Sequence, residues 1–150
     1  DEVPTGARPR LPDVVAVGLQ EIVELNVGNI FWATEEEEIS AHSAFEERVV
    51  KELQRSGQRY MKVGSVGMVG LLLMVYVRGE LADKVREVDC DRVKTGVFHM
   101  AGNKGAVCVR FELSGVSFCF LDVHLHAGQE SQAARNQDIQ DIFSFAFQAC

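Results

Sequence analysis

The stretch that decides the fold is GNKGAVCVRFELSGVSFCFLDVHLHAG, residues 102–128. It contains two apolar runs, residues 106–113 and 116–125, which are joined by Ser114 and Gly115. A Ser-Gly pair between two such runs is typical of the tight turn of a β-hairpin. The stretch therefore predicts two neighbouring antiparallel strands.

The turn also predicts which residues of the two strands face each other. With the two turn residues at the tip, Leu113 faces Val116, and at the far end Gly105 faces His124. Opposed residues share one face of a sheet, and this face is mostly apolar, so we expect it to lie in the core. It carries Val107, Val109, Phe111, Leu113, Val116, Phe118 and Phe120.

Polar residues replace apolar ones at the far end of this face. Asp122 and His124 lie there, beside the Gly-Asn-Lys-Gly loop that contains Asn103 and Lys104. Lys104 brings positive charge, while Asn103, the loop N–H groups and the imidazole bring donors, so this rim could bind an anion. A solvated lysine and an ordinary strand-end histidine would give the same pattern, and the hairpin alone leaves both interpretations open.

A second polar strand end lies near the start of the chain. Residues 12–19, PDVVAVGL, form an apolar run without alternation, which is typical of a central strand covered on both faces. The run ends at Gln20 and Glu21. Glu21 could bind Mg²⁺, which prefers one or two carboxylates together with water and substrate oxygens. A strand-end glutamate is also often a simple surface or capping residue.

The rest of the chain predicts further strands and two helices. Helical spacing is found over residues 44–53 and 130–147, and strands are predicted over residues 60–66, 71–77 and 85–93. The apolar stripes expected on the helices are Phe45, Val49, Val50 and Leu53 on the first, and Ile139, Ile142, Phe143 and Ala146 on the second. Strands that surround two helices indicate an α/β sandwich rather than a bundle.

Composition narrows the class of protein. The chain has 150 residues, 47% of them hydrophobic and 25% charged, which suits one globular domain with a core of its own. Its net charge of −7 argues against a general nucleic-acid-binding protein. The most apolar run, residues 68–77, is about half as long as a membrane-spanning helix. Any membrane contact is therefore expected to be peripheral.

The cysteines and two of the histidines suggest no chemistry. The four cysteines lack the spacing of a zinc site, so we expect reduced, buried thiols in a cytosolic protein. His42 and His126 have no evident partner in the sequence and are expected to be exposed.

Three stretches, in this order, resemble the inositol polyphosphate 5-phosphatases. Residues 12–30, PDVVAVGLQEIVELNVGNI, resemble the family's strand that ends in Gln-Glu, and residues 60–81 resemble the paired strands that come next. Residues 102–128 resemble its Gly-Asn-Lys-Gly strand and the strand that ends in His-Leu. Residues 135–142, RNQDIQDI, resemble the helix that follows. The synaptojanin and type II, OCRL-like branches look most similar.

This resemblance implies an α/β DNase I-like four-layer sandwich, here incomplete, with residues 1–150 as the N-terminal portion of one catalytic domain. It implies Mg²⁺-dependent removal of the 5-phosphate from a phosphoinositide lipid or a soluble inositol phosphate, in the cytoplasm and at membrane surfaces. Glu21 would bind the Mg²⁺, and His124 would contact the scissile phosphate. Asn103 and Lys104 would line the substrate site.

The chain departs from the family pattern beside these residues. Val123 stands where many members have Ser or Thr, and Asp122 stands where Asn or Cys is common. Asp122 is predicted to orient His124 or to raise its pKa, as an adjacent carboxylate would. His99 occupies a loop position where the family tends to have Gly.

The family's later signature blocks, Trp-x-Gly-Asp-x-Asn, Ser/Ala-Trp-x-Asp-Arg and a late Asp-His pair, do not occur in this sequence. The 150 residues alone are therefore expected to be inactive, because parts of a catalytic unit act non-additively. Half a sandwich also leaves strand edges uncovered, so non-native oligomers are expected. Two alternatives remain: a related phosphodiesterase (a nuclease or a sphingomyelinase), and a non-catalytic binding module with the same fold.

Overall fold

A computed structural model describes residues 11–22, 35–68, 70–95 and 104–148 of the chain. Within these ranges the chain forms six strands, two α-helices and one short 3-10 helix. In chain order the elements are β1 (Val14–Leu19), α1 (Glu35–Arg55), β2 (Tyr60–Met68), β3 (Leu71–Arg78), η1 (Gly79–Lys84), β4 (Val85–Lys94), β5 (Gly105–Leu113), β6 (Val116–His124) and α2 (Gln132–Phe145).

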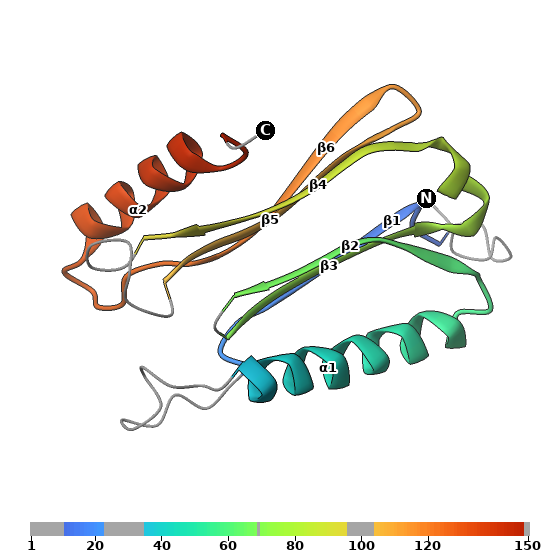
Figure 1. Cartoon of the computed structure of the whole chain (residues 1–150), viewed down its shortest axis with the longest axis horizontal. Coiled ribbons are helices and arrows are strands. Elements are labelled where there is room, and N and C mark those ends of the chain that lie inside the picture. The colour runs from blue at the N-terminus through green and yellow to red at the C-terminus, as the bar shows by residue number, and fades with distance from the viewer. Residues whose placement is uncertain (1–10, 23–34, 69, 96–103, 149–150) are drawn as a thin grey trace, which may run out of the picture.

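The strands form two antiparallel sheets of three strands each. Their orders are β1-β3-β2 and β4-β5-β6. The sheets lie face to face, with α1 on the outer side of the first and α2 on the outer side of the second (Figure 1). The layers therefore run helix, sheet, sheet, helix, as predicted for an α/β sandwich.

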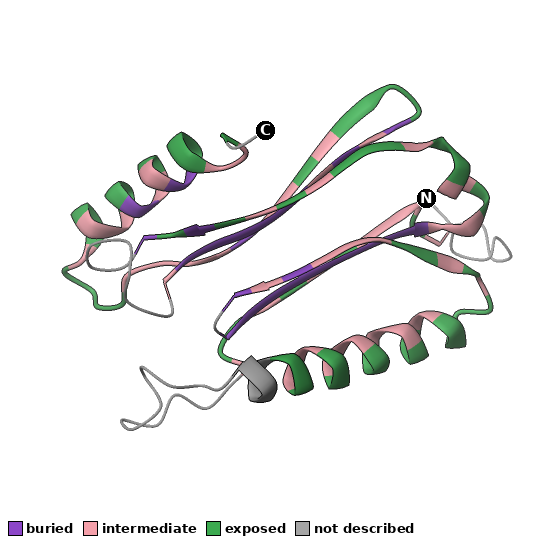
Figure 2. Cartoon of the chain, viewed as in Figure 1, coloured by how far each residue is buried: buried purple, intermediate pink, exposed green. Residues whose placement is uncertain are grey.

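The core is built on the two central strands, β3 and β5, where buried residues concentrate (Figure 2). Their alternating side chains reach both the space between the sheets and the outer helix layer. Each large apolar side chain that is buried in this way contributes about 1.5–3 kcal/mol. The residues between the sheets are Val66, Met68, Leu71, Leu73, Val75, Val77, Val107, Val109, Phe111 and Leu113.

The predicted hairpin is confirmed with its register. Leu113 pairs with Val116, and Gly105 pairs with His124 at the other end. Ser114 and Gly115 both have positive φ, 54° and 80°, as a two-residue turn that matches the twist of the strands requires. The predicted core face is wrong only at Val116, which is exposed because it directly follows the turn.

The place predicted for the first strand is wrong. β1 pairs with β3 alone within the described part of the chain, so it lies at the edge of its sheet. Ala16 and Gly18 are exposed there. The central strand is β3, in which every residue from Leu71 to Val77 is buried. An unbroken apolar run thus identified a strand, but strand order depends on pairings that such a run does not encode.

The two helices differ in how well their stripes were predicted. The apolar stripe of α1 packs on Leu72, Met74 and Tyr76 as expected. In α2 the buried residues are Asp138 and Ile142, and Ala146 packs beside Ile142, whereas Phe143 is 72% exposed; the predicted stripe is therefore confirmed at Ile142 and Ala146 and wrong at Phe143. Asp138, one turn before Ile142, shares this buried face, and its carboxylate accepts hydrogen bonds from His126 in the loop after β6.

Outcomes for the thiols and for His42 are mixed. Cys108 is buried, and burial raises the pKa of its thiol to about 12. Cys90 and Cys119 are free but exposed, contrary to the prediction. His42 is not exposed as expected: its ring is half-buried over Gly67, where an added Cβ would overlap it. No helix in the described residues is long and apolar enough to cross a membrane.

Candidate functional site

Two polar strand ends, one from each sheet, meet at one rim of the sandwich. Glu21 lies two residues after the end of β1, and its backbone is held in the left-handed region with φ 55°. The next residue, Ile22, donates its N–H to the carbonyl of Gly70 at 3.2 Å, which fixes this turn. Left-handed backbone is unfavourable for a glutamate, and such strain gathers at functional sites.

His124, at the end of β6, joins this rim to the second sheet. Its Nε2 lies 2.7 Å from Nζ of Lys104 and 3.5 Å from Oε1 of Glu21. The His124 side chain is 12% exposed, whereas that of Glu21 is 74% exposed and open to solvent. An ammonium, an imidazole and a carboxylate thus converge within reach of one small anion or cation.

Burial lowers the pKa of Lys104, while the nearby carboxylates of Glu21 and Asp138 act in the opposite direction. A lysine beside two carboxylates and a histidine is therefore not a simple solvated turn residue. It can donate to the unprotonated Nε2 of His124, or both groups can donate to an anion placed between them.

Gln20 and Asp122 lie directly behind the rim. The Gln20 side-chain amide donates to Oδ1 of Asp122 at 3.1 Å and to the carbonyl of Val123 at 2.7 Å. Asp122 is only 8% exposed, and burial raises the pKa of its carboxyl although hydrogen bonds from Gln20 and from the backbone of Leu19 lower it. The side-chain hydrogen bond of Asp122 thus runs to Gln20, and not to His124 as its predicted orienting role would require.

A second buried aspartate holds the loop that follows His124. Oδ2 of Asp138, on α2, accepts the backbone N–H of His126 at 2.9 Å and lies 2.7 Å from its Nδ1. Arg135 donates to the carbonyls of His126 and Gly128 at 3.3 and 2.6 Å. Burial alone would raise the pKa of Asp138, but the hydrogen bonds from His126 outweigh it and lower that pKa.

Three of the four predicted site residues are thus brought together: Glu21, Lys104 and His124. Asn103 lies outside the described residues, as does His99. Sequence reasoning missed Gln20 as a partner of Asp122, and it gave His126 no partner. The available signal for Gln20 was Gly18, two residues before it, which leaves room for a side chain from the other sheet.

The rim fits a hard divalent cation in part. Glu21 presents an exposed carboxylate, the ligand type that Mg²⁺ takes, and Mg²⁺ needs only one or two of these beside water and substrate oxygens. Within the described ranges no group of three or more His, Cys, Asp or Glu residues could hold a metal ion. Glu21 can therefore supply one ligand, and other ligands would have to come from elsewhere.

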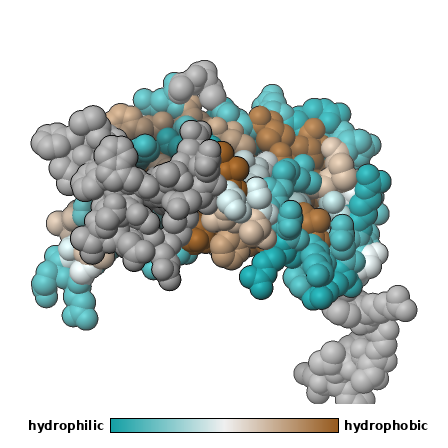
Figure 3. Space-filling model, turned by 60° about the horizontal axis from the view of Figure 1, so that its bottom comes forward, coloured by the Kyte–Doolittle hydropathy of each residue, from teal (hydrophilic) through white to brown (hydrophobic). Residues whose placement is uncertain are grey.

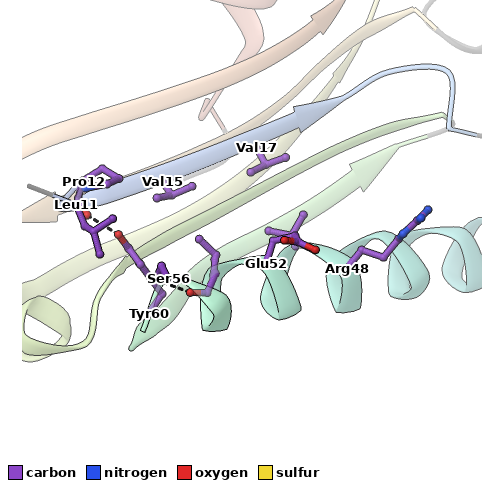
Figure 4. A pocket seen from close by; sticks show the side chains of 10 residues that line it. Leu11, Pro12, Val15, Val17, Arg48, Glu52, Ser56 and Tyr60 are labelled. Atoms are coloured by element: carbon purple, nitrogen blue, oxygen red, sulfur yellow. Dashed lines mark hydrogen bonds between the residues drawn. The ribbon is translucent and has the colours of Figure 1, made fainter. Parts of the chain in front are cut away.

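An apolar groove of about 390 Å³ lies between β1 and α1, away from this rim (Figure 4). Its hydroxyl groups are already bonded, Tyr60 to the carbonyl of Pro12 at 2.8 Å and Ser56 to that of Leu53 at 2.6 Å. Figure 3 shows further hydrophobic residues exposed between hydrophilic ones on the face that it turns forward. The groove is apolar surface left open beside an edge strand and offers no reactive constellation.

The sequence of the chain is similar to one protein family and to several known proteins. The family described as Endonuclease/Exonuclease/phosphatase family 2 matches residues 3–148. Synaptojanin-2 of Rattus norvegicus is 41% identical over 130 residues, which are 87% of this chain and 8% of that protein. The type II inositol 1,4,5-trisphosphate 5-phosphatase of Mus musculus is 38% identical over 133 residues, 89% of this chain and 13% of that protein.

A solved structure extends the similarity to the fold. The inositol polyphosphate 5-phosphatase domain of a synaptojanin, in complex with inositol (1,4)-bisphosphate and a calcium ion, matches with a TM-score of 0.69 and 31% identity. The match covers 93% of this chain and 38% of that chain. A Cimex nitrophorin, 15% identical with a TM-score of 0.57, shares the fold alone. The predicted incomplete α/β DNase I-like fold is thereby confirmed, and the chain spans well under half of the relatives it matches.

Proposed function

Because the chain belongs to the endonuclease/exonuclease/phosphatase family 2, we propose that residues 1–150 form the N-terminal portion of an inositol polyphosphate 5-phosphatase catalytic domain. The longer protein that would contain them is called the parent protein below. The observation that carries this proposal is the convergence of Glu21, Lys104 and His124 at one rim. A relative named as a 5-phosphatase at 38% identity and the solved 5-phosphatase domain of a synaptojanin at 31% identity support it.

The reaction proposed for the parent protein is hydrolysis of the 5-phosphate of a phosphoinositide lipid or a soluble inositol phosphate. Glu21 would be one ligand of Mg²⁺, which, when bound, polarises phosphoryl oxygens and offsets developing negative charge. Lys104 would attract the anionic substrate, and protonated His124 would donate a hydrogen bond to a phosphoryl oxygen. Asn103 is proposed to line the same site. We place the parent protein in the cytoplasm, with peripheral contact to membranes.

The described residues support only one wall of such a site. Glu21, Lys104 and His124 supply a metal ligand, a cation and a donor, but no residue placed to activate the attacking water. The chain covers 38% of the similar solved phosphatase domain. We therefore propose that the 150 residues alone have no phosphatase activity, since the remaining parts of the unit are needed together.

A substrate panel tests this function. The complete catalytic domain of the parent protein and the 150-residue chain would each be incubated with Mg²⁺ and either phosphatidylinositol 4,5-bisphosphate, inositol 1,4,5-trisphosphate, sphingomyelin or DNA. The expected result is phosphate release from one or both inositol substrates by the complete domain only. Cleavage of sphingomyelin or DNA instead would contradict the proposal, as would release of phosphate by the 150 residues alone.

In the described part of the chain one edge of β1 has no partner strand, which suggests a property of the isolated chain. We expect it to self-associate through this edge, because a strand with unpaired backbone groups beside an apolar groove is a template for another chain. Ala16→Lys, at an exposed position of β1, should weaken the self-association about tenfold. Sedimentation equilibrium measures the effect, with Ser40→Lys on the exposed surface of α1 as the matched control. A monomeric wild-type chain at high concentration would rule the edge out.

A further inference from the structure

We propose that Asp122 and Gln20 form a polar link between the two sheets that positions Glu21 and His124 relative to each other. The inference rests on the proposed function for the roles of Glu21 and His124. It assigns Asp122 a positioning role that acts through β1 and differs from direct contact with His124.

The link joins the two strand ends one residue away from each site residue. Gln20, next to Glu21, donates to Asp122 and to the carbonyl of Val123, which is next to His124. β1 and β6 belong to different sheets and are more than 100 residues apart in the chain, so no strand ladder holds these ends together.

The first sheet leaves space for this link at Gly18. A Cβ built on Gly18 would lie 3.0 Å from Cγ and 3.2 Å from Cβ of Asp122. Any side chain larger than hydrogen would therefore press on the Asp122 side chain and move it off Gln20. The glycine is explained by this close approach, since its backbone is in an ordinary strand conformation.

Burying this carboxylate is unfavourable for folding, which points to a role other than stability. Oδ2 of Asp122 is buried and has no hydrogen-bond partner among the described residues. The neighbouring positions on the same face of β6, Phe118 and Phe120, pack against the apolar core. An apolar side chain at position 122 would continue that packing without an unsatisfied oxygen. A polar side chain at this position is explained if an oxygen must accept from the Gln20 amide.

Displacement of Glu21 or His124 by a fraction of an ångström is enough to reduce a rate, because a 1 Å misplacement can cost about 100-fold. The link acts on the distance between the carboxylate and the imidazole, so its loss should lower kcat more than it raises KM. Gln20 and Asp122 are two ends of one interaction, so their substitutions should not be additive.

The experiment uses the complete catalytic domain of the parent protein with the variants Asp122→Ala, Gln20→Ala, the double variant and Asp122→Asn. Each alanine variant should lose about tenfold in kcat, and the double variant should lose no more than Asp122→Ala alone. Asp122→Asn keeps the oxygen that accepts from Gln20 and should retain kcat. Ser117→Ala, on an exposed position of the same strand far from the rim, is the matched control.

A second readout does not depend on activity. Exchange of the Gln20 side-chain amide protons with solvent should be faster in Asp122→Ala than in wild type or Asp122→Asn, since Nε2 then loses one of its two acceptors. If the complete domain hydrolysed no inositol phosphate, the proposed function would fail while exchange still tested the link. Unchanged kcat in both alanine variants, a double variant that loses about 100-fold, or unchanged exchange would each overturn the link. If Asp122→Ala did not fold, Gln20→Ala and Asp122→Asn would decide.

Discussion

Two buried aspartates flank the same strand end, and their surroundings are opposite. Asp138 has two hydrogen bonds from His126, and the pKa of its carboxyl is lowered. Asp122 has one buried oxygen without a partner in the described residues, and burial raises its pKa. A buried carboxylate oxygen that accepts two hydrogen bonds stabilises the loop it holds, whereas a buried oxygen without a partner costs stability and is expected to serve another purpose.

The largest effect on stability should come from Asp138. Replacing it with alanine removes both bonds to His126 and leaves a gap between α2 and the sheet, which should cost about 2–4 kcal/mol of unfolding free energy in the complete domain. Urea denaturation measures this loss. Asp141→Asn is the control: Asp141 lies on the same helix and accepts a hydrogen bond from Gln137 at the surface, and its replacement should cost about 0.5 kcal/mol or less. Equal losses of unfolding free energy in the two variants would contradict a stabilising role for the hydrogen bonds of Asp138.

A smaller effect should appear in the pH dependence of stability. The pKa of Asp138 lies below its ordinary value of 3.8. Folding therefore favours the charged carboxylate over the protonated carboxyl. Its stabilisation is complete above pH 3.8 and is lost as the pH falls through the lower, folded value. His126 and Lys104 are the titratable groups that interact with it.

The measurement is the difference in unfolding free energy between wild type and Asp138→Asn as a function of pH. It should be constant near neutrality and shrink below pH 3.8. A difference that grows with acid would mean that Asp138 is not held in its charged form by the loop.

The smallest effect should come from Asp122→Asn. Because burial disfavours the charged carboxyl here, the neutral amide should leave stability unchanged or raise it by up to about 1 kcal/mol at neutral pH. Thermal unfolding of the complete domain measures it. A loss as large as that of Asp138→Ala would show that the two aspartates are alike and that Asp122 is simply structural.

Features encoded within a short stretch were predictable. The turn at Ser114 set the register of β5 and β6, and this register alone brought Lys104 and His124 to one rim. Features that depend on distant pairs were not. The edge position of β1, the bond from Gln20 to Asp122 and the turn of α2 toward His126 each depend on side chains or strands that the local pattern does not relate.

The resemblance supplied what the local pattern could not, namely the pairing of Glu21 with His124 across the two sheets. Nε2 of His124 and Oε1 of Glu21 are 3.5 Å apart, although the two residues are more than 100 positions apart in the chain. The missed partners share one physical cause: buried polar groups were judged from their own neighbours in sequence, while their hydrogen bonds run to other elements.

The central claim is that Glu21 and His124 act on the same phosphoryl group. The most direct measurement is kcat for phosphate release from phosphatidylinositol 4,5-bisphosphate by the complete domain carrying Glu21→Gln, His124→Ala or both. Each single change should lower kcat by about 100- to 1,000-fold, and the double change should lower it by much less than the product of the two. Single variants that keep wild-type kcat, or effects that multiply fully, would contradict a shared site at this rim.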